Sequence, residues 1–60
     1  LLDENTAKGN KGDGFRLDAA SSGNTLTNNV GKGNKGFDLN DESGGANIIG
    51  DGNDFGTQFP

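Results

Sequence analysis

The chain has 60 residues, 12 of them glycine, with 27% hydrophobic residues and a formal net charge of −4. The acidic balance argues against nucleic acid as a partner, because phosphate binding rests on Lys and Arg, and the absence of Cys and His excludes disulfides and thiolate or imidazole metal sites. No apolar run exceeds two residues, which excludes a transmembrane span and the apolar region of a signal peptide.

An internal repeat opens the chain. The segment 2–12 recurs at 26–36 with an offset of 24 positions, and seven of its eleven residues match. A period of this size is typical of a chain that stacks on itself, coil upon coil. The matching pairs are Leu2/Leu26, Asn5/Asn29, Lys8/Lys32, Gly9/Gly33, Asn10/Asn34, Lys11/Lys35 and Gly12/Gly36.

A second repeat follows the first along the chain. The segment 14–18 recurs at 36–40 with an offset of 22, and Phe59 lies another 22 positions on. In each copy Phe and Leu are two residues apart, which is the period of a half-buried strand. The change from 24 to 22 predicts that Asp13 and Gly14 are inserted at a turn. Strands are expected near 14–18, 24–30, 36–40 and 46–50.

Together the repeats predict an all-β fold, a parallel β-helix or β-solenoid of about two and a half coils of 22–24 residues. We expect residues 1–60 to form a single solenoid segment of a longer repeat protein. Helices are not expected, because Gly, Asn, Asp, Ser and Thr dominate and no stretch keeps a period of 3.6 residues. Four columns are predicted: Leu2/Leu26/Ile49, Thr6/Val30, Phe15/Phe37/Phe59 and Leu17/Leu39.

One motif carries a resemblance to a known family. The pattern Asn-x-Leu-x-x-Asn-Val at 24–30, followed by Asn34-x-Gly36-Phe37-x-Leu39 and then Ser43, resembles the right-handed parallel β-helix repeat of the periplasmic NosD type. The class includes pectate lyases, alginate epimerases and bacterial surface proteins. The resemblance implies a right-handed solenoid in a bacterial extracellular or periplasmic protein. It implies no particular activity, because one solenoid carries many chemistries.

Stacking brings identical residues over each other, since neighbouring strands lie about 4.8 Å apart. Asn5 over Asn29 and Asn10 over Asn34 are predicted to form hydrogen-bonded ladders along the stack. The same offset gathers four of the five basic residues at one corner. This corner is either a solvated turn or a stripe that binds an anionic polymer such as a uronate polysaccharide. The lysines are Lys8, Lys11, Lys32 and Lys35.

Two further patterns are candidate sites. The offset of 22 places Arg16 over Asp38 and Asp18 over Asn40, either as an exposed ion pair or, by the resemblance, as part of a lyase groove that also uses Lys8 and Lys32. The segment 50–56 resembles one turn of the calcium-binding RTX repeat. In such a turn Asp51, Asn53 and Asp54 would face Ca²⁺, and the alternative is an ordinary Gly-Asp turn without a cofactor.

Three functions remain open at this point. The first is a non-catalytic module that binds further coils of its protein and, through the lysines, anionic polysaccharide. The second is a self-assembling solenoid, because an uncapped stack leaves an open strand edge at each end where copies of the chain can pair. The third is a fragment of a polysaccharide lyase or epimerase, which would need a Lys or Arg with a lowered pKa that nothing nearby provides. We expect no catalysis.

Overall fold

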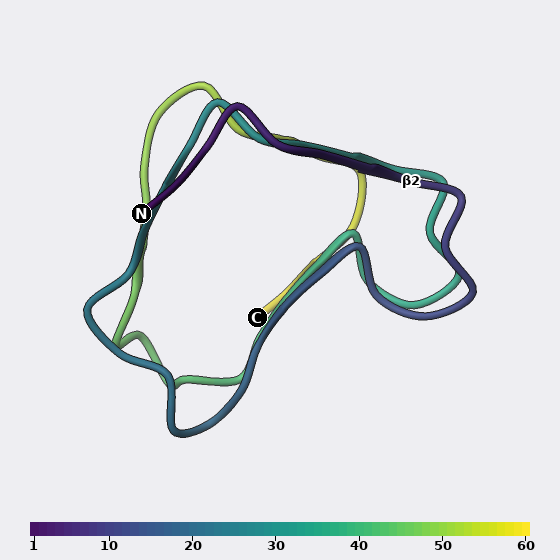
Figure 1. Ribbon diagram of the computed structural model, residues 1–60. Coiled ribbons are helices and arrows are strands. Elements are labelled where there is room, and N and C mark those ends of the chain that lie inside the picture. Colours follow the sequence, from purple (N-terminus) through teal and green to yellow (C-terminus); the bar gives the residue numbers. More distant parts are fainter.

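The computed structural model describes residues 1–60 and contains nine short strands and no helix. Viewed along the stack, the chain winds repeatedly around a roughly triangular outline (Figure 1). The all-β expectation is therefore confirmed. The strands are β1 (Leu2–Asp3), β2 (Thr6–Lys8), β3 (Phe15–Leu17), β4 (Thr25–Thr27), β5 (Val30–Lys32), β6 (Leu39–Asp41), β7 (Ile48–Ile49), β8 (Asp54–Phe55) and β9 (Gln58–Phe59).

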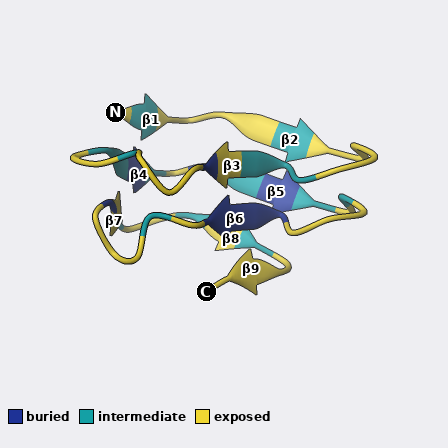
Figure 2. Cartoon of the chain, turned by 90° about the horizontal axis from the view of Figure 1, so that it is seen from below, coloured by how far each residue is buried: buried dark blue, intermediate teal, exposed yellow.

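The strands form three parallel sheets, ordered β1-β4-β7, β2-β5-β8 and β3-β6-β9. Each pass of the chain thus contributes one strand to each sheet, which is the architecture of a parallel β-solenoid. We call β1–β3 the first rung, β4–β6 the second and β7–β9 the third. Seen from the side, the rungs lie in this order from the N-terminal to the C-terminal end (Figure 2).

The first two sheets keep the predicted register. Leu2 pairs with Leu26 and Leu26 with Ile49, so the first apolar column is confirmed. Thr6 pairs with Val30, as predicted, and Asp54 continues this column into the third rung. The 24-residue echo in the sequence therefore corresponds to one full pass around the solenoid.

The third sheet corrects two predicted columns. Phe15 pairs with Leu39 and Leu17 with Asp41, so the columns Phe15/Phe37/Phe59 and Leu17/Leu39 are wrong. The offset stays at 24 here because Asp13 and Gly14 are not an insertion: the Gly14 N–H donates to the Phe37 carbonyl at 2.9 Å. The two Gly-Phe segments are therefore similar in sequence but displaced by two residues in the stack. Their similarity does not define the stacking register.

The strand boundaries also differ from the prediction at one corner. The expected strand at 24–30 is two strands, β4 and β5, which belong to different sheets. The chain bends between them at Asn28, which has a positive φ of 56°. Glu4 and Gly52 occupy the same corner in the other rungs with φ of 59° and 78°. Asn and Gly suit this left-handed conformation, whereas Glu adopts it at some cost.

The apolar core is small. Leu17, Leu26 and Leu39 are the buried hydrophobic residues, and Leu2, Phe15, Ile49 and Phe55 pack against them. The rings of Phe15 and Phe55 meet edge to face, with centroids 5.7 Å apart. Five polar residues are buried as well, so polar residues outnumber leucines among the buried side chains. They are Asn29, Asp38, Asn40, Asp41 and Asn47.

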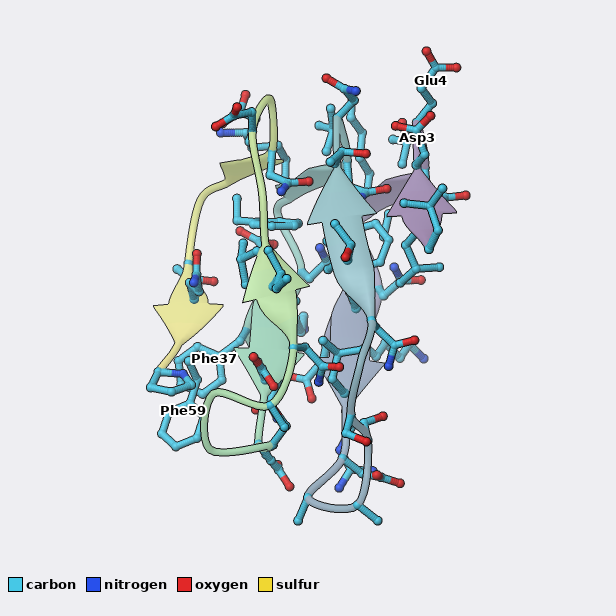
Figure 3. The ribbon with its side chains drawn as sticks, turned by 90° about the vertical axis from the view of Figure 1, so that its left-hand side faces the viewer. Asp3, Glu4, Phe37 and Phe59 are labelled. Atoms are coloured by element: carbon cyan, nitrogen blue, oxygen red, sulfur yellow. The ribbon has the colours of Figure 1, made fainter.

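Phe37 and Phe59 lie outside this core. Their ring centroids are 5.5 Å apart, and the residues are 40% and 45% exposed. Figure 3 shows the two rings beside each other toward the C-terminal end, opposite the end that carries Asp3 and Glu4. The predicted contact between Phe37 and Phe59 thus exists, but on the surface.

The third rung is shorter than the second. Residues 33–38 form a protruding corner between β5 and β6, whereas Gly56 and Thr57 alone connect β8 to β9. In Figure 1 the yellow segment takes this direct path inside the teal and purple corners. The molecule is therefore narrower at its C-terminal end.

Candidate binding surfaces

An asparagine ladder runs through all three rungs, as predicted for its first two members. The Asn5 N–H and side-chain amide both donate to Asn29 Oδ1, at 2.9 and 3.2 Å. Asn29 makes the same two bonds to Asn53 Oδ1, at 2.9 and 3.1 Å. The Asn29 and Asn53 side chains also donate to the Leu2 and Leu26 carbonyls of the preceding rung. At Asn29, which is fully buried, the ladder thus satisfies polar groups that water does not reach.

A second predicted ladder joins Asn10 to Asn34, whose Oδ1 accepts from the Asn10 N–H at 3.0 Å and from its side chain at 2.9 Å. Asn24 and Asn47 form a third, with bonds of 2.9 and 3.0 Å, that the sequence analysis did not identify. Both residues directly precede a strand, and this shared placement is the signal that could have identified them.

The four lysines share one corner, which we call the lysine corner (Lys8, Lys11, Lys32 and Lys35). Lys8 pairs in register with Lys32 across β2 and β5. The Lys35 N–H donates to the Asn10 carbonyl and the Gly36 N–H to the Gly12 carbonyl, both at 2.9 Å, which places Lys35 beside Lys11. The predicted grouping of the lysines therefore holds in the first and second rungs.

The lysine corner is only partly neutralised. Lys32 Nζ lies 2.6 Å from Asp54 Oδ1 in the third rung, and both side chains are well exposed. The one other ion pair in the chain joins Arg16 to Glu42. Lys8, Lys11 and Lys35 have no acidic partner, so their charges face solvent.

Arg16 has different neighbours from those predicted. It pairs in register with Asn40, not with Asp38, and its guanidinium lies 3.3 Å from Glu42 Oε1. Asp18 does not lie over Asn40; its carboxylate accepts the Ala20 N–H within its own turn. These residues therefore do not form the groove that a polysaccharide lyase would require.

A polar cluster surrounds Asn40 on this sheet. Its side-chain amide donates to Asp13 Oδ2 and to Glu42 Oε2, each at 3.0 Å, and its own Oδ1 is buried without a partner. The bond from Asn40, followed by that from the Phe37 N–H, lowers the pKa of Asp13. Sequence reasoning missed this cluster because the offset of 22 paired the wrong residues.

Two carboxylates are buried without a basic partner. Asp38 Oδ1 accepts from the Asn34 side chain at 2.7 Å and from its N–H at 3.1 Å, and the Asn34 side chain foremost lowers the pKa of Asp38. Asp41 Oδ1 accepts from the Ser43 hydroxyl at 2.6 Å, which is the main reason that the pKa of Asp41 is lowered. Both groups are held as carboxylates by neutral donors.

The residues of the calcium-like turn have other partners. Asn53 Oδ1 accepts the two bonds from Asn29, Asp54 pairs with Lys32, and the Asp51 carbonyl accepts the Asn28 N–H at 3.1 Å. No group of three or more Asp or Glu side chains is placed to hold a metal ion.

The surface carries no pocket, and no helix is available that could cross a membrane. Any ligand would therefore bind on an open face. No protein-family model matches the chain, and no curated protein or solved structure matches it either.

Proposed function

We propose that this chain is a non-catalytic β-solenoid module that binds anionic polysaccharide at the lysine corner. The observation that carries the proposal is the register of Lys8 on Lys32 together with the placement of Lys35 beside Lys11. In a chain of net charge −4, four of five basic residues on one corner form a local positive patch. Such a patch attracts a polyanion despite the overall charge, because surface potentials follow local charge.

The spacing of the lysines favours a ligand with regularly repeated charge. Rungs lie about 4.8 Å apart, so the first and second rungs place Lys8 beside Lys32 and Lys11 beside Lys35 at a short spacing. A uronate polysaccharide carries one carboxylate on each sugar and suits this arrangement. The corner is solvent-exposed and has no pocket, which fits a long flexible polymer better than a small molecule.

The parent architecture is part of the proposal. The motifs around Asn24–Val30 and Gly36–Leu39 support a right-handed solenoid of the NosD and pectate-lyase kind, from a bacterial extracellular or periplasmic protein. The exposed lysine corner would then be one binding face of a stack that is extended by further coils, either of the same protein or of a second copy.

Titration of the chain with polygalacturonate at low ionic strength tests the proposed binding. We expect saturable binding that weakens as salt is added, because exposed charges are screened. The double variant Lys11→Gln/Lys35→Gln should bind severalfold more weakly. Arg16→Gln removes one positive charge from a different face and should change the affinity much less. Absence of binding at low salt, or equal loss with Arg16→Gln, would rule out the lysine corner.

A further inference from the structure

Both ends of the solenoid present unpaired strand edges. The strands β1, β2 and β3 each have one neighbour, as do β7, β8 and β9, whereas β4, β5 and β6 each have two. Figure 2 shows these two sets at opposite ends of the molecule. An exposed edge offers backbone N–H and C=O groups for pairing with another strand. We propose that the third rung of one chain binds the first rung of a second copy, head to tail.

The asparagine ladder gives this association its direction. At each step the donors belong to the earlier rung and Oδ1 of the later rung accepts them, first from Asn5 to Asn29 and then from Asn29 to Asn53. Within the chain the Asn53 N–H donates to no acceptor, and Asn5 Oδ1 accepts from no donor. The Asn53 N–H of one copy can therefore donate to Asn5 Oδ1 of the next, as the Asn5 and Asn29 N–H groups donate within the chain, while the Asn53 side-chain amide keeps its bonds to the Leu26 and Gly50 carbonyls.

The same register continues the apolar columns of the first two sheets. Ile49 ends the column that begins at Leu2, and Phe55 ends the column of Ala7 and Gly31. Stacking Asn53 on Asn5 of the second copy sets Ile49 on its Leu2 and Phe55 on its Ala7. Two like ends that meet would instead oppose the strand directions, and the ladder would face acceptor to acceptor or donor to donor.

Charge complementarity favours a second copy as the occupant. Asp54 pairs in register with Val30, and Lys32, two positions further along β5, reaches it at 2.6 Å. In the proposed register Asp54 faces Thr6 of the second copy, and Lys8 lies two positions further along that strand. Lys8 of the second copy is then placed to pair with Asp54 from the side opposite to Lys32. Lys8 has no acidic partner within its own chain.

One corner opposes the association. Asp51 follows Ile49 in the third rung, and Asp3 and Glu4 follow Leu2 in the first, so the acidic side chains meet when the ends stack. The repulsion is between exposed groups and is therefore screened by salt. Salt screens this repulsion and the attraction between Asp54 and Lys8 alike, whereas the Asp51 variant and the disulfide register described below depend on association alone. The two proposals can thus be tested separately.

Sedimentation velocity over a wide concentration range tests the head-to-tail contact. We expect species that grow beyond dimers with concentration, because a head-to-tail contact does not close on itself. Lys8→Gln should weaken association severalfold without changing the circular dichroism of the folded chain. Asp51→Lys should strengthen it, and Lys35→Gln, in the middle rung, should leave it unchanged. A folded monomer at all concentrations, or a dimer that grows no further, would overturn the proposal.

Disulfide trapping tests the register, since the chain has no cysteine of its own. Residues paired across neighbouring strands lie about 4.8 Å apart, within the range of about 4.4–6.8 Å that a disulfide spans. Copies with Thr6→Cys mixed with copies with Asp54→Cys should form mixed disulfides on oxidation. Thr6→Cys mixed with Thr25→Cys is the matched control. Equal yields from both mixtures would contradict the proposed register.

Discussion

Asp38 and Thr57 hold each other through two reciprocal hydrogen bonds. The Asp38 N–H donates to Thr57 Oγ1 and the Thr57 N–H donates to Asp38 Oδ2, each at 2.9 Å. Asp38 also accepts both bonds from Asn34, so one buried carboxylate joins the end of the Asn10/Asn34 ladder to the third rung. These two hydrogen bonds connect the second rung to the third at the place where the third rung lacks the protruding corner.

Replacing Thr57 should weaken this closure. Thr57→Val keeps the shape of the side chain but leaves the buried Asp38 N–H without an acceptor, which costs about 1–3 kcal/mol. Thr57→Ser retains the hydroxyl and should cost less. Urea denaturation of the two variants checks the difference, and equal midpoints would show that the hydroxyl contributes nothing.

Acid should destabilise the fold. The pKa values of Asp3, Asp13, Asp38 and Asp41 all lie below the ordinary value of about 3.9, with hydrogen bonds as the principal cause. The unfolded chain therefore binds more protons, and these carboxylates contribute stability that is complete above about pH 5 and declines as the pH falls through their folded pKa values. Urea midpoints should be flat from about pH 7 to 5 and fall below about pH 4. A midpoint that rises on acidification would contradict this assignment.

Gly14 should be intolerant of a side chain. A Cβ at this position would lie 2.5 Å from Asn34 Nδ2 and 2.7 Å from the Asp38 carbonyl, whereas one at Gly12 meets nothing within 4 Å. Gly14→Ala should lower the unfolding free energy by about 1–3 kcal/mol through overpacking, and Gly12→Ala should change it little. Thermal unfolding followed by circular dichroism measures both, and a neutral Gly14→Ala would mean that the rungs separate easily.

Leu26 is the centre of the apolar core and is fully buried. Leu26→Ala should cost about 2–5 kcal/mol, a large share of what a domain of this size possesses. Ile48→Ala is the control, because Ile48 is 64% exposed, and it should cost less than about 0.5 kcal/mol. Similar losses in the two variants would indicate that the core is not centred on Leu26.

The sequence predicted the fold and the register of the first two sheets because several residue types repeat together at one offset. Leu2 with Leu26 and Asn5 with Asn29 each match in kind, and both pairs lie in register or in the ladder. The third sheet could not be predicted in this way. Leu17 pairs with Asp41, so a leucine lies beside a carboxylate in this sheet. The Ser43 hydroxyl donates to Asp41 Oδ1 and so compensates for the burial of this carboxylate.

The candidate sites were also predicted only in part, because residues that lie in contact are not always of the same type. The grouping of the four lysines followed directly from the repeat. The pairing of Asp54 with Lys32 did not, because residues 50–56 have no counterpart of similar sequence at 26–32 and were interpreted as a turn of another kind. The cluster of Asp13, Asn40 and Glu42 depends on contacts between different residue types, which a search for repeated letters does not detect.

The predominance of amides and carboxylates over leucines in the interior has a thermal consequence. Unfolding exposes little apolar surface here, and the newly exposed polar surface acts in the opposite direction on the heat capacity. The heat-capacity change of unfolding is therefore small for 60 residues, and stability varies only gently with temperature. A solenoid held together by asparagine ladders should, for this reason, resist unfolding in the cold.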